Sequence, residues 1–323
     1  MHTRVLISSP ALARLALVAC LVLPLSGCSL KTMAINTMAE TLAASGEVYG
    51  SDEDPDLVRD ALPFSLKTVE SLLAASPRHR GLLLTACSGF TSYAYAFLDA
   101  DARRLEASDL RRARHLQHRA LRMYLRARAY CLRGLHVGHP AFQTTLVTDS
   151  ASALAPMRPD DVALLYWTAA SWAAAIALAL DDPELIADLP AVKAVAGRAL
   201  ELDEAFAAGA IHELLIRLEA AGPASEGAAD KARQHFNRAV ALSKGRRVGP
   251  YVSLAEAVAL PEEDRAEFIR LLEQALSIDP AAAPGDRVAN LVAQQRARDL
   301  LDHVDDLFVI GSSGGAASRR RQP

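Results

Sequence analysis

Apolar residues recur at intervals of three and four along most of the chain, which is the periodicity of amphipathic helices. Asp54 and Pro55 open one such stretch with a capping carboxylate and a proline suited to the first helical position. Pro63 is expected to kink or split this helix, which should end before Pro77. Because alternating strand patterns are scarce and Ala, Leu, Arg and Glu dominate, we predict an all-α fold.

The predicted helices are separated by breaks rich in Gly, Pro, Asp and Ser. They cover residues 33–44, 55–75, 80–100, 109–135, 160–180, 184–202 with an interruption at Pro190, 205–221, 228–243, 250–259, 263–277 and 286–308. The chain after residue 310 is rich in Gly and Ser and contains three consecutive arginines, so it is expected to be a disordered tail. One helical domain over residues 33–309 and a tail over 310–323 are therefore predicted.

The second half of the chain contains a degenerate repeat. Three helix ends share a small alanine followed by an apolar residue and a capping Asp or Ser, at Ala199–Asp203, Ala239–Ser243 and Ala275–Pro280. Their spacings of 40 and 36 residues bracket the length of a tetratricopeptide-like helical hairpin. Such hairpins cannot bury their apolar faces alone, so the pattern favours a stacked α-solenoid with a concave face.

The first residues have the pattern of a secretion signal that is removed by cleavage. Arg4 and Arg14 give a positive start, and Leu15–Leu25 is an apolar run too short to span a bilayer. The run ends in Leu25-Ser26-Gly27-Cys28, which resembles the lipobox of bacterial lipoproteins. We therefore predict a signal peptide over residues 1–27, a lipidated Cys28 and a linker over 28–32; the alternative is an ordinary secretory signal. A serine at position 29 favours the outer membrane over the inner one.

Charge and cysteine content restrict the partners and the compartment. Cleavage would remove two of the 35 basic residues and none of the 38 acidic ones, leaving a net charge of about −5, which argues against nucleic acid as a partner. Cys87 and Cys131 would remain in the folded part, either as buried free thiols or as a disulfide in an oxidising compartment. No segment after the signal is expected to span a membrane, and Leu164–Leu180 is the nearest to doing so.

Several short segments together resemble one known family. From about Met38 to Phe308 the chain is similar to the TatT component family, tetratricopeptide-like lipoproteins associated with TRAP-type transporters. The resemblance implies a binding or adaptor role beside a periplasmic solute-binding protein, and it carries no established catalytic residues. The segments are Ala44–Gly46 with Val48-Tyr49, Ser51–Pro55, Arg59–Pro63, Ser88–Thr91 with Tyr93-Ala94, Leu165–Thr168 with Ser171-Trp172, Ala210–Glu213, and Gly249–Tyr251 with Leu254–Glu256.

Catalytic and metal-binding motifs are missing from the sequence. It contains no Gly-rich phosphate loop, no Cys-x-x-Cys and no Gly-x-Ser-x-Gly elbow. His212-Glu213 begins like a zinc-protease helix, but Ile216 occupies the position of the second histidine. The acidic cluster Asp52–Asp54 is better explained by helix capping than by a calcium loop. We therefore expect no enzyme activity, no metal and no cofactor.

Aromatic residues, which form only 5% of the chain, gather on a few mid-chain helices. Together with a few polar groups they would suit an apolar pocket that orients a small, partly apolar ligand. The alternative is that they fill gaps in a helical core. The candidate pocket residues are Tyr93, Tyr95, Tyr166, Trp167, Trp172, His212, Glu213, Tyr251 and Glu256.

Arginines recur every seven residues along one side of the helix predicted at 109–135. Residues 110–135 include no acidic residue, so the stripe could bind an acidic partner surface or lipid phosphates, unless it is simply solvated. The candidate partner-binding residues are Arg112, Arg119, Arg122, Arg126 and Arg133.

These patterns lead to one functional prediction. The chain is expected to be a lipid-anchored accessory component of a TRAP-type uptake system that binds the periplasmic solute-binding protein and a small ligand. The alternative is an envelope scaffold or assembly lipoprotein of the same architecture without a transport role. The sequence leaves open whether the protein forms a homo-oligomer.

Overall fold

The computed structural model describes residues 37–38, 41, 46–221 and 227–312 of this chain. Over these residues it contains helices and no strands, so the predicted all-α fold is confirmed. The expected signal peptide, Cys28 and the linker that follows it lie outside the described residues, as does the chain from residue 313 onward.

The structure contains α-helices together with short 3-10 and π-helical segments. Their bounds are α2 Pro55–Ala75, α3 Arg80–Tyr93, η1 Ala94–Asp99, α4 Ala100–Leu105, α5 Leu110–Gly138, α6 Phe142–Thr148, α7 Ser150–Leu154, η2 Pro159–Asp161, α8 Val162–Leu178, α9 Pro183–Ala187, α10 Leu189–Leu202, η3 Phe206–Gly209, α11 Ala210–Ala220, α12 Ala228–Ser243, α13 Gly249–Leu254, η4 Ala255–Ala259, α14 Arg265–Ser277, η5 Pro280–Ala282, η6 Pro284–Asp286, α15 Arg287–Asp302 and α16 Val304–Ser312.

Most helices lie where the apolar periodicity predicts them, with informative exceptions. Pro63 does not split α2, which begins after the capping carboxylate of Asp54 and continues to Ala75. The segment around Pro190 does divide, because α9 ends before Asp188 and the proline lies in the first turn of α10. The short helices α6 and α7 were not predicted, and α16 extends to Ser312, past the expected start of the tail.

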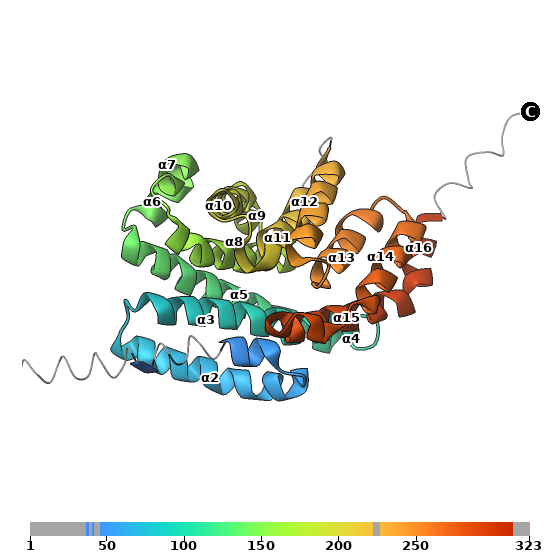
Figure 1. Ribbon diagram of the computed structural model, residues 1–323, viewed down its shortest axis with the longest axis horizontal. Helices are drawn as coiled ribbons and strands as arrows, with labels where there is room; N and C mark the ends of the chain where they lie inside the picture. The colour runs from blue at the N-terminus through green and yellow to red at the C-terminus, as the bar shows by residue number, and fades with distance from the viewer. Residues whose placement is uncertain (1–36, 39–40, 42–45, 222–226, 313–323) are drawn as a thin grey trace, which may run out of the picture.

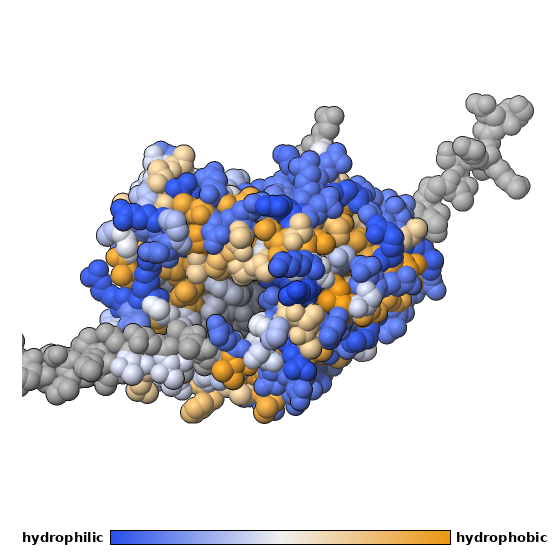
Figure 2. Space-filling view, in the orientation of Figure 1, coloured by the Kyte–Doolittle hydropathy of each residue, from blue (hydrophilic) through white to orange (hydrophobic). Residues whose placement is uncertain are grey.

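The long helix α5 is the centre of the N-terminal half (Figure 1). It packs against α3 and α8, and α8 in turn packs against α10. The pairs α11 with α12 and α14 with α15 continue the stack toward the C-terminus, where they form a second hydrophobic core. In Figure 2, apolar side chains gather in a band across the middle of the visible face, over α8, α11 and α13, and hydrophilic side chains surround it.

The C-terminal helices turn back onto the N-terminal ones. α15 contacts α2, and Figure 1 shows α15 lying beside α4. The backbones at Gly50 and Gly285 approach so closely that a Cβ atom at residue 50 would lie 2.6 Å from the carbonyl oxygen of Gly285. An ion pair of 3.0 Å between Arg287 and Glu53 joins the same two regions. The ends of the helical array are therefore held together.

Two helical segments are long and apolar enough, by length and composition alone, to cross a membrane. They are Arg80–Leu105 and Pro159–Leu178, and 50% and 56% of their most apolar windows are buried inside the structure. Both pack on α5 near the middle of the protein, so burial against other helices accounts for their apolar character.

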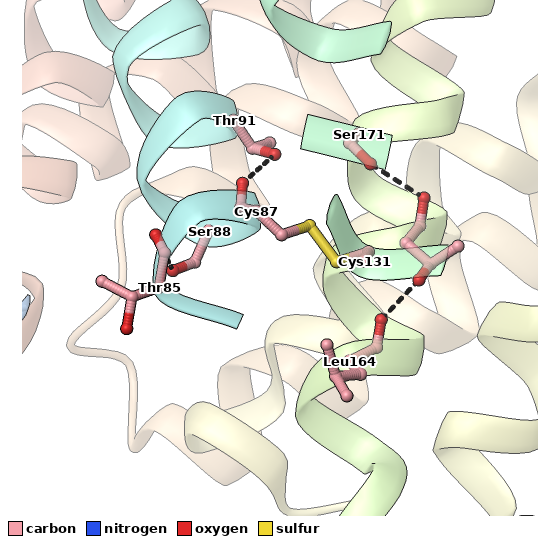
Figure 3. The surroundings of a disulfide bond; sticks show 8 residues. Thr85, Cys87, Ser88, Thr91, Cys131, Leu164 and Ser171 are labelled. Carbon is pink, nitrogen blue, oxygen red and sulfur yellow. Dashed lines mark hydrogen bonds between the residues drawn. A yellow bond between two sulfur atoms is a disulfide. The ribbon is translucent and has the colours of Figure 1, made fainter. Parts of the chain in front are cut away.

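A disulfide bond between Cys87 of α3 and Cys131 of α5 ties the two helices together (Figure 3). The two Cα atoms are 5.4 Å apart, and both side chains are fully buried. The sequence left the state of these thiols open, and the structure pairs them. Nearby hydroxyls bond to their own helices, as Thr91 does by donating to the carbonyl oxygen of Cys87 over 2.8 Å.

Opening this disulfide should lower the free energy of unfolding substantially. The bond links residues 44 apart, and the chain-entropy relation for a loop of this length gives a loss of about 4 kcal/mol. Denaturant unfolding of the Cys87→Ala/Cys131→Ala variant, and of the wild type with and without a phosphine reductant, measures the effect. Equal midpoints for the oxidised and reduced wild type would show that the cross-link is absent or irrelevant to stability.

Candidate functional site

The carboxylate of Glu256, whose side chain is 20% exposed, links helices of the C-terminal half. It lies on the π-helical segment η4 and accepts hydrogen bonds from Arg217 of α11 over 2.7 Å and from Arg296 of α15 over 2.6 and 2.8 Å. Arg217 also donates from its Nε atom to the hydroxyl of Ser253 on α13, over 3.1 Å. We call these four residues, with the neighbours described next, the central polar cluster.

The N-terminal half contributes a second carboxylate to this cluster. Asp99 ends the π-helical segment η1 and accepts a hydrogen bond of 2.5 Å from Arg103 of α4. Tyr95, on the same π-helical segment, lies with its ring 5.9 Å from the Arg103 guanidinium and interacts electrostatically with Arg217. The hydroxyl of Tyr124 is buried near these groups and has no hydrogen-bond partner among the described residues.

Charges from three further segments adjoin the central polar cluster beside Tyr166 of α8. Arg247 forms ion pairs with Glu213 of α11 over 3.1 Å and with Asp286 over 3.6 Å, and all three charged groups influence Tyr166. Glu213 packs tightly under the start of α13, since a Cβ atom at Gly249 would lie 2.0 Å from its Oε1 atom. Any larger residue at 249 would therefore push this carboxylate away from Arg247.

Burial and charge compete in setting the pKa values of the cluster. Burial raises the pKa of Glu256, but Arg217, Arg296 and Arg103 outweigh it and hold that pKa below its ordinary value. Burial likewise lowers the pKa of Arg217, and nearby acidic groups, among them Tyr95 and Glu256, reverse the shift. Burial raises the pKa of Tyr166 well above its ordinary value. At neutral pH the carboxylate and the guanidinium groups are therefore charged and Tyr166 is neutral.

Four of the nine candidate pocket residues, Tyr95, Tyr166, Glu213 and Glu256, thus lie in or beside the central polar cluster. Trp167 adjoins them, because its ring contacts that of Tyr166 at a centroid distance of 5.0 Å. The other candidates lie in different surroundings.

Trp172, Tyr251 and Tyr93 pack with other partners. Trp172 is 6% exposed; its indole group donates to Asp188 over 3.1 Å, and the Arg128 guanidinium lies 4.9 Å from its ring. Tyr251 packs edge-on against Phe236 in the C-terminal core, and Tyr93 packs against Phe97 of η1.

His212 belongs to a separate cluster between α11 and α12. Its Nδ1 atom lies 2.8 Å from Nδ1 of His235, and its Nε2 atom lies 3.1 Å from Glu204, which also accepts from Arg238 over 2.6 Å. Because a carboxylate accepts, His212 carries its proton on Nε2 and accepts at Nδ1 from His235. No group of three His, Cys, Asp or Glu side chains within the described parts of the chain is arranged to hold a metal ion.

The arginine stripe of α5 divides into two parts. Arg126 pairs with Glu70 of α2 and lies over the ring of Phe90, and Arg133 donates to the carbonyl oxygen of Pro77 over 3.0 Å. These two arginines hold α5 against its neighbours. For Arg112, Arg119 and Arg122, the structured ranges contain no side-chain hydrogen bond or ion pair.

The sequence did not identify the arginines of the central polar cluster. Arg217 interrupts an apolar run in α11, which is a usable signal for a buried or pocket-facing charge. Arg103, Arg247 and Arg296 lie among many other arginines, and no pattern in the sequence distinguishes them.

The histidine pair predicts a pH-dependent stability. Burial lowers the pKa of His212, more than Glu204 raises it, and burial together with His212 lowers the pKa of His235. Below the unfolded value of about 6.5 the unfolded chain therefore binds more protons than the folded one, and the free energy of unfolding falls as the pH falls. Each histidine can contribute up to about 1.4 kcal/mol per pH unit.

Urea unfolding between pH 7.5 and pH 5 measures this slope. His235→Gln keeps an N–H donor for His212 without a titrating ring and should flatten the profile. His118→Gln, at an exposed position of α5, is the matched control and should leave the slope unchanged. A wild-type profile that rises toward acid pH would contradict the assignment of neutral histidines.

Comparisons with known proteins agree with the extent of the helical array. The family model described as TRAP transporter T-component matches residues 51–308. An uncharacterized protein of Treponema pallidum (strain Nichols) is 30% identical over 303 residues, which cover 88% of this chain and 94% of that protein. The family is one of accessory transporter components rather than of enzymes, and its association with a transport system places it at the cell envelope. This chain therefore belongs to the TRAP transporter T-component family.

Proposed function

We propose that this chain is the lipid-anchored periplasmic accessory component of a TRAP-type solute uptake system. The family match over residues 51–308 is the observation that carries the proposal. In this role the protein binds the periplasmic solute-binding protein and holds a small, partly apolar ligand, and the helix pairs form a tetratricopeptide-like solenoid that supports both tasks.

The buried disulfide supports an envelope location. Disulfides form and persist in oxidising compartments such as the bacterial periplasm, and they are rare where thiols are kept reduced. The Cys87–Cys131 bond therefore agrees with secretion by the N-terminal signal and with anchoring through Cys28.

The central polar cluster supports a ligand-binding role. The side chain of Arg217 keeps 40% of its surface open, and Tyr95 is 39% exposed, although burial is the largest influence on the pKa of Arg217. The cluster therefore presents a charged and an aromatic side chain at a surface that a ligand can reach. Tyr166 and Trp167 would contact the apolar part of the ligand.

The proposed docking surface is the face of α5 that bears the exposed Arg112 and Arg122 and the half-buried Arg119. These guanidinium groups are not engaged elsewhere in the described structure, unlike Arg126 and Arg133, so they remain available to an acidic partner. Complementary charge mainly accelerates and orients the encounter of two proteins.

The anchor is tested by replacing Cys28. The Cys28→Ala variant should lose lipidation and either remain an unprocessed precursor or leave the membrane fraction. Membrane fractionation and the intact mass of the protein measure the change. A variant that fractionates with membranes at the mass of the mature chain would exclude lipid anchoring through Cys28.

Docking is tested with the solute-binding protein that co-purifies with the chain from native membranes. The Arg119→Glu/Arg122→Glu variant should associate more slowly, by about tenfold or more at low salt, and the wild-type rate should fall as salt is added. Stability should change by no more than about 0.5 kcal/mol per site, because neither side chain has a polar partner.

The matched control is Lys231→Glu/Arg298→Glu, which makes the same change in charge at exposed positions of α12 and α15. It should associate at nearly the wild-type rate. Equal rates for the wild type and the α5 variant would exclude this face. Recovery of envelope-assembly proteins instead of transporter components would favour a scaffold role.

A further inference from the structure

A hollow lies between α2, the end of α3, η1, α4 and the first turns of α5, and no residue of the central polar cluster lines it. Its volume is about 380 Å³. Phe97 and Leu98, both nearly fully buried, form its floor together with the ring of Tyr93 and the side chain of Leu116. Pockets of this size are typical of sites for small organic molecules, and this one combines apolar with charged lining residues.

The rim of the hollow carries an excess of positive charge. Four arginines and a single aspartate, Asp101, contribute to its lining. Asp101 pairs with Arg59 of α2 and, over 3.4 Å, with Arg104 of α4. Arg104 also lies 3.5 Å from Asp299 of α15, and Arg59 lies 3.5 Å from Asp56. These two arginines are therefore already balanced by carboxylates.

The other two arginines of the rim, Arg112 and Arg119, are not balanced. They are seven residues apart and share a face of α5, and neither forms an ion pair or side-chain hydrogen bond within the ranges that the structure describes. The nearest acidic residues along the chain have other roles. Asp109 caps α5 by accepting from the backbone of Arg112 over 3.0 Å, and Glu106 accepts from Gln117 over 2.8 Å. Neither lines the hollow.

We propose that this hollow binds a small organic anion with an apolar body and a carboxylate group. A planar carboxylate matches the paired N–H donors of a guanidinium, so Arg112 and Arg119 would bind it from one side of the opening. The apolar body would lie on Phe97, Leu98 and Tyr93, where it removes apolar surface from water. Because the two arginines line the same concave space as the apolar residues, a small anion can contact both together.

Titration of the mature chain with 4-phenylbutyrate tests the site by calorimetry or ligand-observed NMR. Two probes separate the contributions: 4-phenylbutanol has the apolar body without the charge, and acetate has the charge without the body. We expect 4-phenylbutyrate to bind with a Kd on the order of 0.1–1 mM and both other probes to bind at least about tenfold more weakly.

The Arg112→Gln/Arg119→Gln variant should weaken the binding of 4-phenylbutyrate by about tenfold or more, because it removes both uncompensated charges. The control Arg111→Gln/Arg114→Gln removes the same charge from the same helix at exposed positions that do not line the hollow, and it should bind like the wild type. Neither variant should change the thermal unfolding midpoint, since none of these side chains has a polar partner in the described structure.

Three outcomes would overturn the proposal: no binding of 4-phenylbutyrate at millimolar concentration, equal binding of the alcohol, or an equal loss in the control variant. The measurement uses this chain alone. If 4-phenylbutyrate does not bind, the proposed role in transport is unaffected. If no solute-binding partner is found, the proposed anion site is unaffected.

Discussion

The bridge from Glu256 to Arg217 and Arg296 is the interaction on which the C-terminal half of this protein depends. One carboxylate receives hydrogen bonds from two helices, α11 and α15, and itself lies on a third segment. If one member of this bridge were replaced by a neutral residue, a remaining charge would lose its partner in surroundings that hold little water. The resulting loss of stability would exceed the net stabilisation that the intact bridge provides. The position of α15 relative to α11 is therefore set by charge as well as by apolar packing, and α15 in turn contacts the N-terminal helix α2.

Both π-helical segments of the described chain contribute to the same cluster. η1 contributes Tyr95 and Asp99, and η4 contributes Glu256. A π-helical turn inserts one extra residue into an α-helix and rotates the side chains that follow, and such turns occur often at functional sites. An uninterrupted α-helix would direct these residues elsewhere. The π-helical segments thus direct the side chains of Tyr95, Asp99 and Glu256 into the polar cluster.

The sequence predicted the helices well because helix periodicity is a local property. The capping carboxylate of Asp54 and the break near Pro190 were visible in the residues themselves. Pro63 does not split α2: its neighbours Leu62 and Leu66 are buried, and their packing holds the helix continuous through the proline. The short helices α6 and α7 were missed because each has too few turns to show a period.

The site was only partly predictable, for a different reason. Tyr95, Tyr166, Glu213 and Glu256 were chosen by residue type, and their place in or beside one cluster depends on the closure of the helical array. Trp172 has the same chemistry but packs beside α10, and His212, next to Glu213 in sequence, faces α12. Adjacent residues of a helix point in directions about 100° apart. His212 and Glu213, which the sequence suggested as one motif, therefore lie in two different clusters.

The central polar cluster and the hollow at the start of α5 differ in charge in a way that bears on selectivity. In the centre, Arg103, Arg217, Arg247 and Arg296 are matched by Asp99, Glu213, Glu256 and Asp286. A charged ligand entering there would have to compete with existing ion pairs, so an uncharged polar group with an apolar body fits better. At the start of α5, by contrast, Arg112 and Arg119 have no such partners among the described residues, and an anion gains attraction there without breaking a pair. One helical scaffold therefore offers two environments, of which the central cluster favours an uncharged polar group and the hollow at the start of α5 favours an anion.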